Sequence, residues 1–203
     1  MIKNIIFDWS GTLSDDFSPV YKASKLVFQK LGHPGLTEQE FKSEFQLPVI
    51  KFYKQYFPDL TRETSFDLFI EEFNKQDKPI IYKGVRELIE VLYNKGINMI
   101  ILSSHPQPNI EQEAKDYQIF PYLKQIYGGV IDKTQAIQNI LINNNFKSNE
   151  TAFVGDMIHD IEAGKEGKVK TIAITWGYDS PEKLKTANPD FIIKSIEEIE
   201  SII

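Results

Sequence analysis

Six short apolar runs, each too short to form a helix, constrain the fold of this chain most strongly. They are residues 4–7, 98–102, 125–127, 152–154, 171–175 and 191–193. Runs of this length without polar alternation are typical of strands buried on both faces. Helical patterns lie between most of them, and Val85, Leu88 and Leu92 are one example. This alternation predicts an α/β fold, with a Rossmann-like, doubly wound and mostly parallel sheet.

The segment of residues 16–79 has a different pattern from the rest of the chain. Strand-like runs are absent there, and phenylalanines recur at helical spacing. We therefore predict an α/β core of residues 1–15 and 80–203 with an inserted, all-helical cap of residues 16–79. Because the insertion follows the first strand, we expect it to lie over the carboxyl edge of the sheet.

Capping patterns predict where the helices of this segment begin. Ser18 followed by Pro19 is typical of an N-cap with proline at the first helical position, and Thr37 with Glu40 has the capping-box form. Ser65 predicts the start of another helix. One face of that helix would carry Phe66, Phe69, Ile70 and Phe73.

Composition excludes several classes of protein. The 203 residues are 41% hydrophobic, enough for one substantial core with at most a small second unit. A net charge of -6 and a pI near 5.2 argue against nucleic acid or an anionic membrane as a partner. The chain has no cysteine, so disulfides, thiolate nucleophiles and cysteine-ligated metals are excluded.

The apolar run at the start of the chain is far shorter than a signal peptide requires, and no later run reaches transmembrane length. We therefore expect a soluble, cytoplasmic protein, as a monomer or a homodimer.

Polar residues follow the apolar runs at the point where each predicted strand ends. In an open parallel sheet the ligand site lies outside the carboxyl ends of the strands, so these residues should converge. Asp8 follows the first run, and Lys133 begins a predicted helix. The full set is Asp8, Ser103, Ser104, Lys133, Asp156 and Asp160.

This set of residue types favours phosphoryl transfer. Carboxylates gathered at one edge repel one another unless a cation lies among them, and hard oxygen ligands without histidine or cysteine suit Mg²⁺. Lys133 and a serine hydroxyl would bind the anionic group that the metal also contacts. Charge neutralisation and positioning are what phosphoryl transfer needs, so we expect a small phosphorylated substrate.

The stretches FDWSGTL, ILSS, Lys133 and VGDMIHD resemble, in order, the four motifs of the haloacid dehalogenase superfamily. The helical segment resembles the small C1-type cap of that superfamily, as in its phosphoglycolate-phosphatase-like members. The later stretches TIAITWGY and NPDFIIKSIEEI match as well. The resemblance covers the whole chain and implies a Mg²⁺-dependent phosphatase.

The resemblance also implies a role for individual residues. Asp8 would be the nucleophile that becomes an aspartyl phosphate, in a catalytic set of Asp8, Ser10 and Lys133. The phosphate-binding candidates are Ser103, Ser104, Lys133, Gly11 and Thr12. The metal-binding candidates are Asp8, Ser10 through its backbone carbonyl, Asp156, and Asp160 directly or through water.

Ser10 departs from the pattern of the family. Most phosphatases of the superfamily carry an aspartate at this place, which acts as general acid for the leaving alcohol and then as base for water. Losing such a group costs about 10²–10⁴ in rate for a poor leaving group and little for a leaving group that needs no proton. Asp15, Asp16 or a cap residue is a hypothetical replacement.

Two other functions stay open at this point. DWSGT also resembles the motif of phosphonoacetaldehyde hydrolase, in which a cap lysine forms an imine with the substrate. Lys51 would take that role if it were desolvated, and otherwise it is a lysine on the outer face of a cap helix. The third hypothesis is a phosphoryl-binding regulatory protein that has lost turnover.

Each site residue also has an ordinary structural alternative. Asp8 precedes a Gly-Thr turn, and Asp156 could stabilise the start of a helix through the helix dipole. His105 and His159 receive no catalytic role, because an isolated histidine is usually structural. Trp176 and Tyr178 are interpreted as aromatic residues of the core or its rim.

Overall fold

The computed structural model describes residues 1–203, which divide into two compact units. One unit joins Met1–Asp15 to Ile80–Ile203, and the other is Asp16–Pro79. The first, the core unit, contains every strand, whereas the second contains only helices. No helix in either unit combines the length and the apolar character needed to cross a membrane.

The core unit is built on a six-stranded sheet in the order β5-β4-β1-β6-β7-β8. Every neighbouring pair in this sheet is parallel, so the predicted α/β class with a doubly wound sheet is confirmed. The strands are β1 (Asn4–Phe7), β4 (Asn98–Leu102), β5 (Gln125–Tyr127), β6 (Thr151–Gly155), β7 (Lys170–Ile174) and β8 (Phe191–Ile193). Only the ends of β6 and β7 differ from prediction, by one residue.

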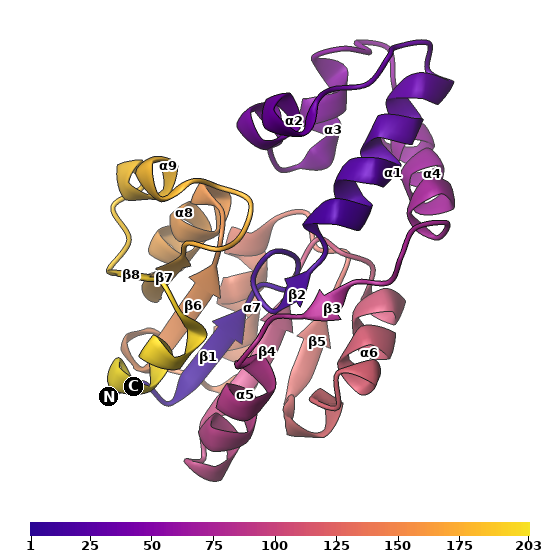
Figure 1. The fold of residues 1–203 in the computed structure, drawn as a ribbon. Coiled ribbons are helices and arrows are strands. Elements are labelled where there is room, and N and C mark those ends of the chain that lie inside the picture. Colours follow the sequence, from indigo (N-terminus) through magenta and orange to yellow (C-terminus); the bar gives the residue numbers. More distant parts are fainter. The chain divides into compact units, whose positions relative to one another are not determined.

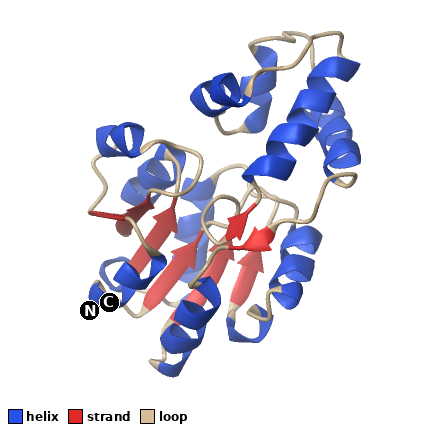
Figure 2. Cartoon of the chain, in the orientation of Figure 1, coloured by secondary structure: helices blue, strands red, loops and turns tan.

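Helices cover both faces of this sheet, as the blue ribbons around the red strands show in Figure 2, and Figure 1 labels these elements. Consecutive residues of β1 therefore pack in different clusters: Ile5 and Phe7 lie in one, and Ile6 lies with Ile137 and Ile140 in another. Burial on both sides explains why the strands lack polar alternation. The helices of the core unit are α5 (Val85–Asn94), α6 (Gln107–Asp116), α7 (Lys133–Asn144), α8 (Ile158–Glu166) and α9 (Pro181–Thr186).

A short antiparallel ribbon marks the place where the chain leaves the core unit and returns to it. Strand β2 (Ser14–Asp15) pairs with β3 (Ile80–Ile81). The remaining core segments are the 3₁₀ turns η1 (Phe120–Tyr122), η2 (Ser148–Glu150) and η3 (Ile196–Ser201).

The helical unit is held together by aromatic side chains. Phe28, Phe41, Phe52 and Tyr53 are all buried, and their rings pack mainly in tilted and edge-on pairs. The helices are α1 (Phe17–Lys30), α2 (Glu38–Glu44), α3 (Val49–Lys54) and α4 (Arg62–Phe73).

One of the predicted helix starts in this unit is confirmed. The Thr37 hydroxyl accepts the backbone N–H of Glu40, and the Glu40 carboxylate accepts the N–H of Thr37 at 2.7 Å. Helix α1 instead begins at Phe17, so Pro19 lies within the first turn, where a missing N–H is tolerated.

The predicted start of α4 is wrong, whereas its predicted face is partly buried: Phe73 is buried and stacks on Phe69. The helix begins at Arg62, because the Thr61 hydroxyl accepts the N–H of Thr64 and so caps it earlier than Ser65. Phe66 is 47% exposed, whereas Glu72 is buried. The carboxylate of Glu72 is neutralised by lysines from two directions, which permits its burial.

Candidate active site

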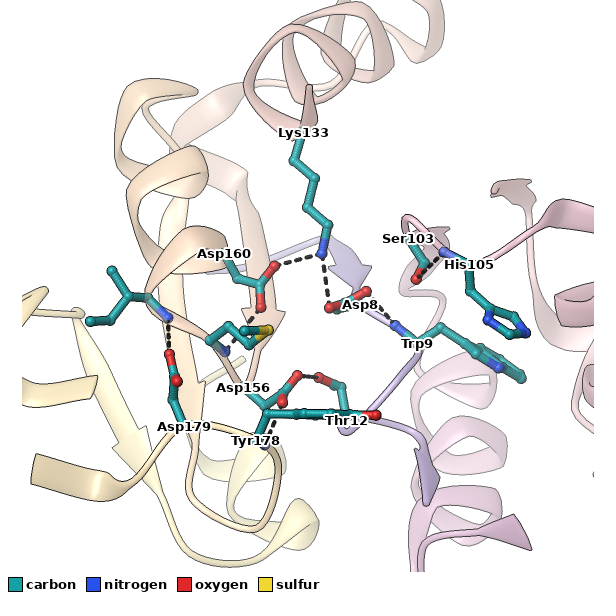
Figure 3. Close-up of polar contacts among 12 residues, drawn as sticks. Asp8, Trp9, Thr12, Ser103, His105, Lys133, Asp156, Asp160, Tyr178 and Asp179 are labelled. Carbon is teal, nitrogen blue, oxygen red and sulfur yellow. Dashed lines mark hydrogen bonds and ion pairs between the residues drawn. The ribbon is translucent and has the colours of Figure 1, made fainter. Parts of the chain in front are cut away.

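The carboxyl ends of three neighbouring strands bring the predicted site residues to one edge of the sheet (Figure 3). Strand β1 pairs in parallel with β4 on one side and with β6 on the other. Asp8, Ser103 and Asp156 follow these three strands directly, and all three side chains are buried. The predicted convergence at this edge is therefore present.

Lys133 connects two of the carboxylates. Its ammonium lies 2.8 Å from Asp8 Oδ2 and 2.6 Å from Asp160 Oδ1. The lysine opens helix α7, whose N-cap is Asp132, and it is 1% exposed. Because water does not reach this lysine, its charge is balanced by the carboxylates of Asp8 and Asp160.

Asp156 and Asp160 complete an acidic cluster with Asp8. One ligand oxygen from each of the three lies within 4.8 Å of the others, and all three residues are buried. Asp156 Oδ2 accepts the N–H of Tyr178 at 2.7 Å, and Asp160 Oδ2 accepts that of Met157 at 3.1 Å. These hydrogen bonds to the backbone fix the orientation of each carboxylate.

Burial and mutual repulsion set the protonation of this cluster. Burial raises the pKa of Asp156 well above its ordinary value, and the charges of Asp160 and Asp8 raise it further. The pKa of Asp8 is also raised by burial, against the opposing charge of Lys133. Burial alone would lower the pKa of Lys133, but the charges of Asp160 and Asp8 raise it.

Gly11 and Thr12 support Asp156 from the loop after β1. A Cβ at Gly11 would lie 2.4 Å from Asp156 Oδ2, and the φ of Gly11 is +71°, so only glycine fits. The Thr12 hydroxyl donates to Asp156 Oδ1 at 2.9 Å. The backbone N–H groups of both residues bond within the loop. These two residues thus support Asp156, and their predicted contacts to phosphate stay a prediction.

The model of the family described as haloacid dehalogenase-like hydrolase matches residues 5–174, which include Asp8, Ser103, Lys133, Asp156 and Asp160. The chain belongs to this family. The resemblance found in the motifs is thereby confirmed, and the chain is an enzyme of the hydrolase class.

Individual relatives of this hydrolase match it over nearly their whole length. A phosphoglycolate phosphatase of Vibrio parahaemolyticus is 24% identical, with 100% of this chain and 96% of the relative covered. A pyrophosphatase PpaX of Listeria welshimeri is 27% identical with the same coverage. The structure of a haloacid dehalogenase-like hydrolase from Streptococcus pneumoniae superposes with a TM-score of 0.87 at 20% identity, covering 99% of this chain and 98% of that one.

The two serines after β4 lie in different environments. Ser103 is 2% exposed, and its hydroxyl accepts the N–H of His105 at 3.3 Å. Ser104 is exposed. In this family member Ser103 is therefore the better placed of the two for a ligand beside Asp8.

Ser10 is partly exposed and forms a backbone bridge with Ser14. Of the two aspartates considered as replacement acids, Asp15 lies in β2 of the core unit. Asp16 is buried at the N-cap position of α1. The role of either aspartate in proton transfer stays a prediction.

Lys51 lies exposed on α3, whereas its neighbours Phe52 and Tyr53 are buried. An imine-forming lysine must be desolvated to be neutral at ordinary pH. The exposed position agrees with the alternative of a lysine on the outer face of a cap helix, and the imine-forming role of Lys51 stays a prediction.

Several residues that support the site were not predicted. Tyr178 was interpreted only as an aromatic residue, yet its backbone N–H holds Asp156. Asp179 accepts the N–H of Ile158 at 2.8 Å and so caps α8, the helix that carries Asp160. The GYD stretch soon after β7 was the available signal. Glu113, in the middle of α6, offered none, because it reads as an ordinary helical glutamate.

Proposed function

We propose that this hydrolase is a Mg²⁺-dependent phosphatase that acts on a small phosphorylated metabolite through an aspartyl phosphate at Asp8. The supporting observation is the buried group at the sheet edge: Asp8 lies 2.8 Å from the Lys133 ammonium and within a three-carboxylate cluster. The names of the relatives, phosphoglycolate phosphatase and pyrophosphatase, support the same reaction class.

The donor set fits Mg²⁺. Three buried carboxylates have one lysine among them, and it pairs with only Asp8 and Asp160. Burial, with the added charge of Asp160, raises the pKa of Asp8 and of Asp156. Asp8, Asp156 and the backbone carbonyl of Ser10 would hold the ion, with Asp160 binding it directly or through water. When bound, Mg²⁺ neutralises charge on the phosphoryl oxygens.

In the first half-reaction a carboxylate oxygen of Asp8 attacks phosphorus. The new O–P bond forms while the bond to the leaving oxygen breaks, and that oxygen departs with the electron pair. The Trp9 backbone N–H holds Asp8 Oδ1 at 2.7 Å, which restricts rotation of the nucleophile. Lys133 and the Ser103 hydroxyl hold the phosphoryl oxygens.

In the second half-reaction water attacks the phosphorus of phospho-Asp8. The bond between Asp8 and phosphorus breaks, inorganic phosphate leaves and the carboxylate is restored. With serine at position 10, the proton of this water passes to solvent or to phosphate itself. Dephosphorylation of phospho-Asp8 is therefore the step that we expect to limit turnover.

Ser10 also selects among leaving groups. A serine hydroxyl does not protonate a departing alkoxide, so esters of ordinary alcohols should react slowly. Phosphate leaving from pyrophosphate, or p-nitrophenolate leaving from its phosphate ester, departs as a stable anion. We therefore expect this enzyme to prefer substrates with such leaving groups.

The test is release of inorganic phosphate with Mg²⁺ from phosphoglycolate, pyrophosphate and p-nitrophenyl phosphate. Asp8→Asn should abolish release while its circular dichroism spectrum stays that of the wild type. Asp59→Asn, at an exposed aspartate, is the matched control and should retain full activity. Undiminished release in Asp8→Asn would refute the mechanism.

A second measurement addresses the covalent intermediate. Acid quenching during turnover, followed by mass spectrometry, should find one phosphoryl group on the peptide that contains Asp8. Tight binding of a phosphate ester without release of product would instead support the alternative of a phosphoryl-binding regulatory protein.

A further inference from the structure

The side chain of Glu113 contacts two loops, the one that follows Asp8 and the one that follows Ser103. It is on α6, and its side chain is 13% exposed. One oxygen, Oε2, accepts the indole N–H of Trp9 at 2.7 Å and the hydroxyl of Ser14 at 3.2 Å. The other oxygen, Oε1, lies 3.5 Å from Nε2 of His105.

The first of these loops holds the nucleophile. Trp9 follows Asp8 directly, and its backbone N–H bonds to the Asp8 carboxylate. The Trp9 carbonyl accepts the N–H groups of Thr12, Leu13 and Ser14, so the loop closes on this one residue. The Trp9 ring is fully buried, and it stacks on Tyr117 with ring centroids 5.7 Å apart. Fixing the indole therefore fixes the backbone that orients Asp8.

The second loop holds the phosphate-binding hydroxyl. The backbone N–H of His105 bonds to the hydroxyl of Ser103, while the His105 ring meets Glu113. In Figure 3 the rings of His105 and Trp9 both extend away from Lys133 and Asp160. Both side chains therefore point away from the acidic cluster, and both contact Glu113 on α6.

Glu113 is a partly buried carboxylate, and the hydrogen bonds that it accepts offset the cost of removing its charge from water. Ser14 is fully buried, and its hydroxyl also meets the Tyr117 hydroxyl at 2.8 Å, which extends the network along α6. Apolar side chains could fill this space without any requirement for hydrogen-bond partners. The network instead connects one anchor, on one helix, to both loops.

We propose that Glu113 is a positioning residue that sets the distance between the Asp8 carboxylate and the Ser103 hydroxyl. It acts through Trp9 and Ser14 on one side and through His105 on the other. The inference rests on the proposed function, because it assumes that Asp8 and Ser103 act on the same phosphoryl group. The inference adds Glu113 as the residue that keeps Asp8 and Ser103 at the distance this reaction requires.

The experiment compares steady-state kinetics of Glu113→Ala, Glu113→Gln and Trp9→Phe on a substrate that the wild type hydrolyses and Asp8→Asn does not. Glu113→Ala should lower kcat by about 10–100-fold, the range typical of residues that orient catalytic groups, with a smaller change in KM. Glu113→Gln keeps an oxygen that accepts the indole N–H and should recover part of the loss. Glu111→Ala, two residues earlier on α6, is the matched control and should leave both constants unchanged.

A double-mutant cycle separates positioning from simple loss of structure. If Glu113 acts through Trp9, the variant with both Glu113→Gln and Trp9→Phe should lose little more kcat than the worse single variant. The inference would be overturned if the kcat losses of the two single variants multiplied in the double variant, or if Glu113→Ala had the kcat of the wild type. If Glu113→Ala does not fold, Glu113→Gln and Trp9→Phe still decide the question by the same criterion. Because wild-type turnover and its loss in Asp8→Asn are established first, failure here leaves the proposed function standing.

Discussion

The ammonium group of Lys133 lies 2.8 Å from the Oδ2 atom of Asp8, and both side chains are almost fully buried. Asp160 contacts the same ammonium from the other side at 2.6 Å. One cation thus holds two of the three carboxylates of the cluster, which leaves the group with excess negative charge. This relationship governs both the stability of the site and its chemistry.

Replacing Lys133 by methionine should destabilise the protein and abolish phosphate release. Removing one partner of a buried ion pair leaves uncompensated charge and typically costs about 3–5 kcal/mol. Urea denaturation measures the free energy of unfolding. Lys147→Met is the matched control, because the Lys147 side chain is 74% exposed, and its effect should stay within about 0.5 kcal/mol. Equal stability of the two variants would contradict the role of Lys133.

Asp156→Asn should remove the effect of Mg²⁺ on thermal stability. A ligand that binds only the folded state stabilises it by about 2.7 kcal/mol at one hundred times its Kd. Differential scanning fluorimetry with increasing Mg²⁺ should therefore raise the Tm of the wild type and of Asp59→Asn but leave Asp156→Asn unchanged. An equal rise in all three proteins would place the ion elsewhere.

Without metal, Asp156→Asn should itself be more stable than the wild type at neutral pH. The pKa of Asp156 is raised in the folded protein, first by burial, from an ordinary value of 3.8. The folded state thus binds more protons than the unfolded state above that value, and its stability falls as pH rises. An asparagine keeps the contacts, because the Thr12 hydroxyl can accept as well as donate.

The measurement for this prediction is the difference in unfolding free energy between the two proteins from pH 4 to pH 8, in chelator. Other groups, such as Glu71, whose pKa is lowered to about 2 by hydrogen bonds from Lys30 and Lys75, act in the opposite direction but cancel in the difference. The advantage of Asp156→Asn should grow as pH rises over this range. A difference independent of pH would mean that Asp156 is not perturbed.

Ser10→Asp should increase the rate for poor leaving groups selectively. If position 10 can supply general acid and base, an aspartate there should accelerate hydrolysis of an alkyl phosphate by up to about 10²–10⁴ and change p-nitrophenyl phosphate far less. Asparagine has nearly the same size as aspartate but no acidic group, so Ser10→Asn is the matched control. Rates that rise equally for both substrates, or equally in both variants, would exclude proton transfer as the cause.

Gly11→Ala should damage the site more than Gly96→Ala does. Both glycines have positive φ, +71° and +75°, so both substitutions carry backbone strain, of about 1 kcal/mol or more. At Gly11 the new Cβ would also meet Asp156 Oδ2 at 2.4 Å, whereas nothing lies within 4 Å at Gly96. Gly11→Ala should therefore lose Mg²⁺-dependent stabilisation as well, and Gly96→Ala should keep it. Identical Mg²⁺ responses would show that Asp156 can move.

The sequence predicted the sheet and the edge at which the site lies, because both follow from local patterns. A strand buried on both faces must be apolar at successive positions, and residues 4–7 and 98–102 show this without any knowledge of their neighbours. The position of Asp8 at a strand end then follows from topology. The start of α4 was missed because threonine and serine are both good N-caps, and only the structure shows that the Thr61 hydroxyl accepts the N–H of Thr64.

The sequence by itself determined the fold class and the family, and it predicted that Asp8, Lys133, Asp156 and Asp160 lie at one sheet edge, because their places follow from the order of strands and helices. Only the tertiary structure decided that Thr12 and Tyr178 hold Asp156, that Lys51 is exposed, and that Glu113 joins two loops. The physical reason is that a hydrogen bond depends on positions within about 3 Å, between residues such as Trp9 and Glu113 that are 104 positions apart in the chain.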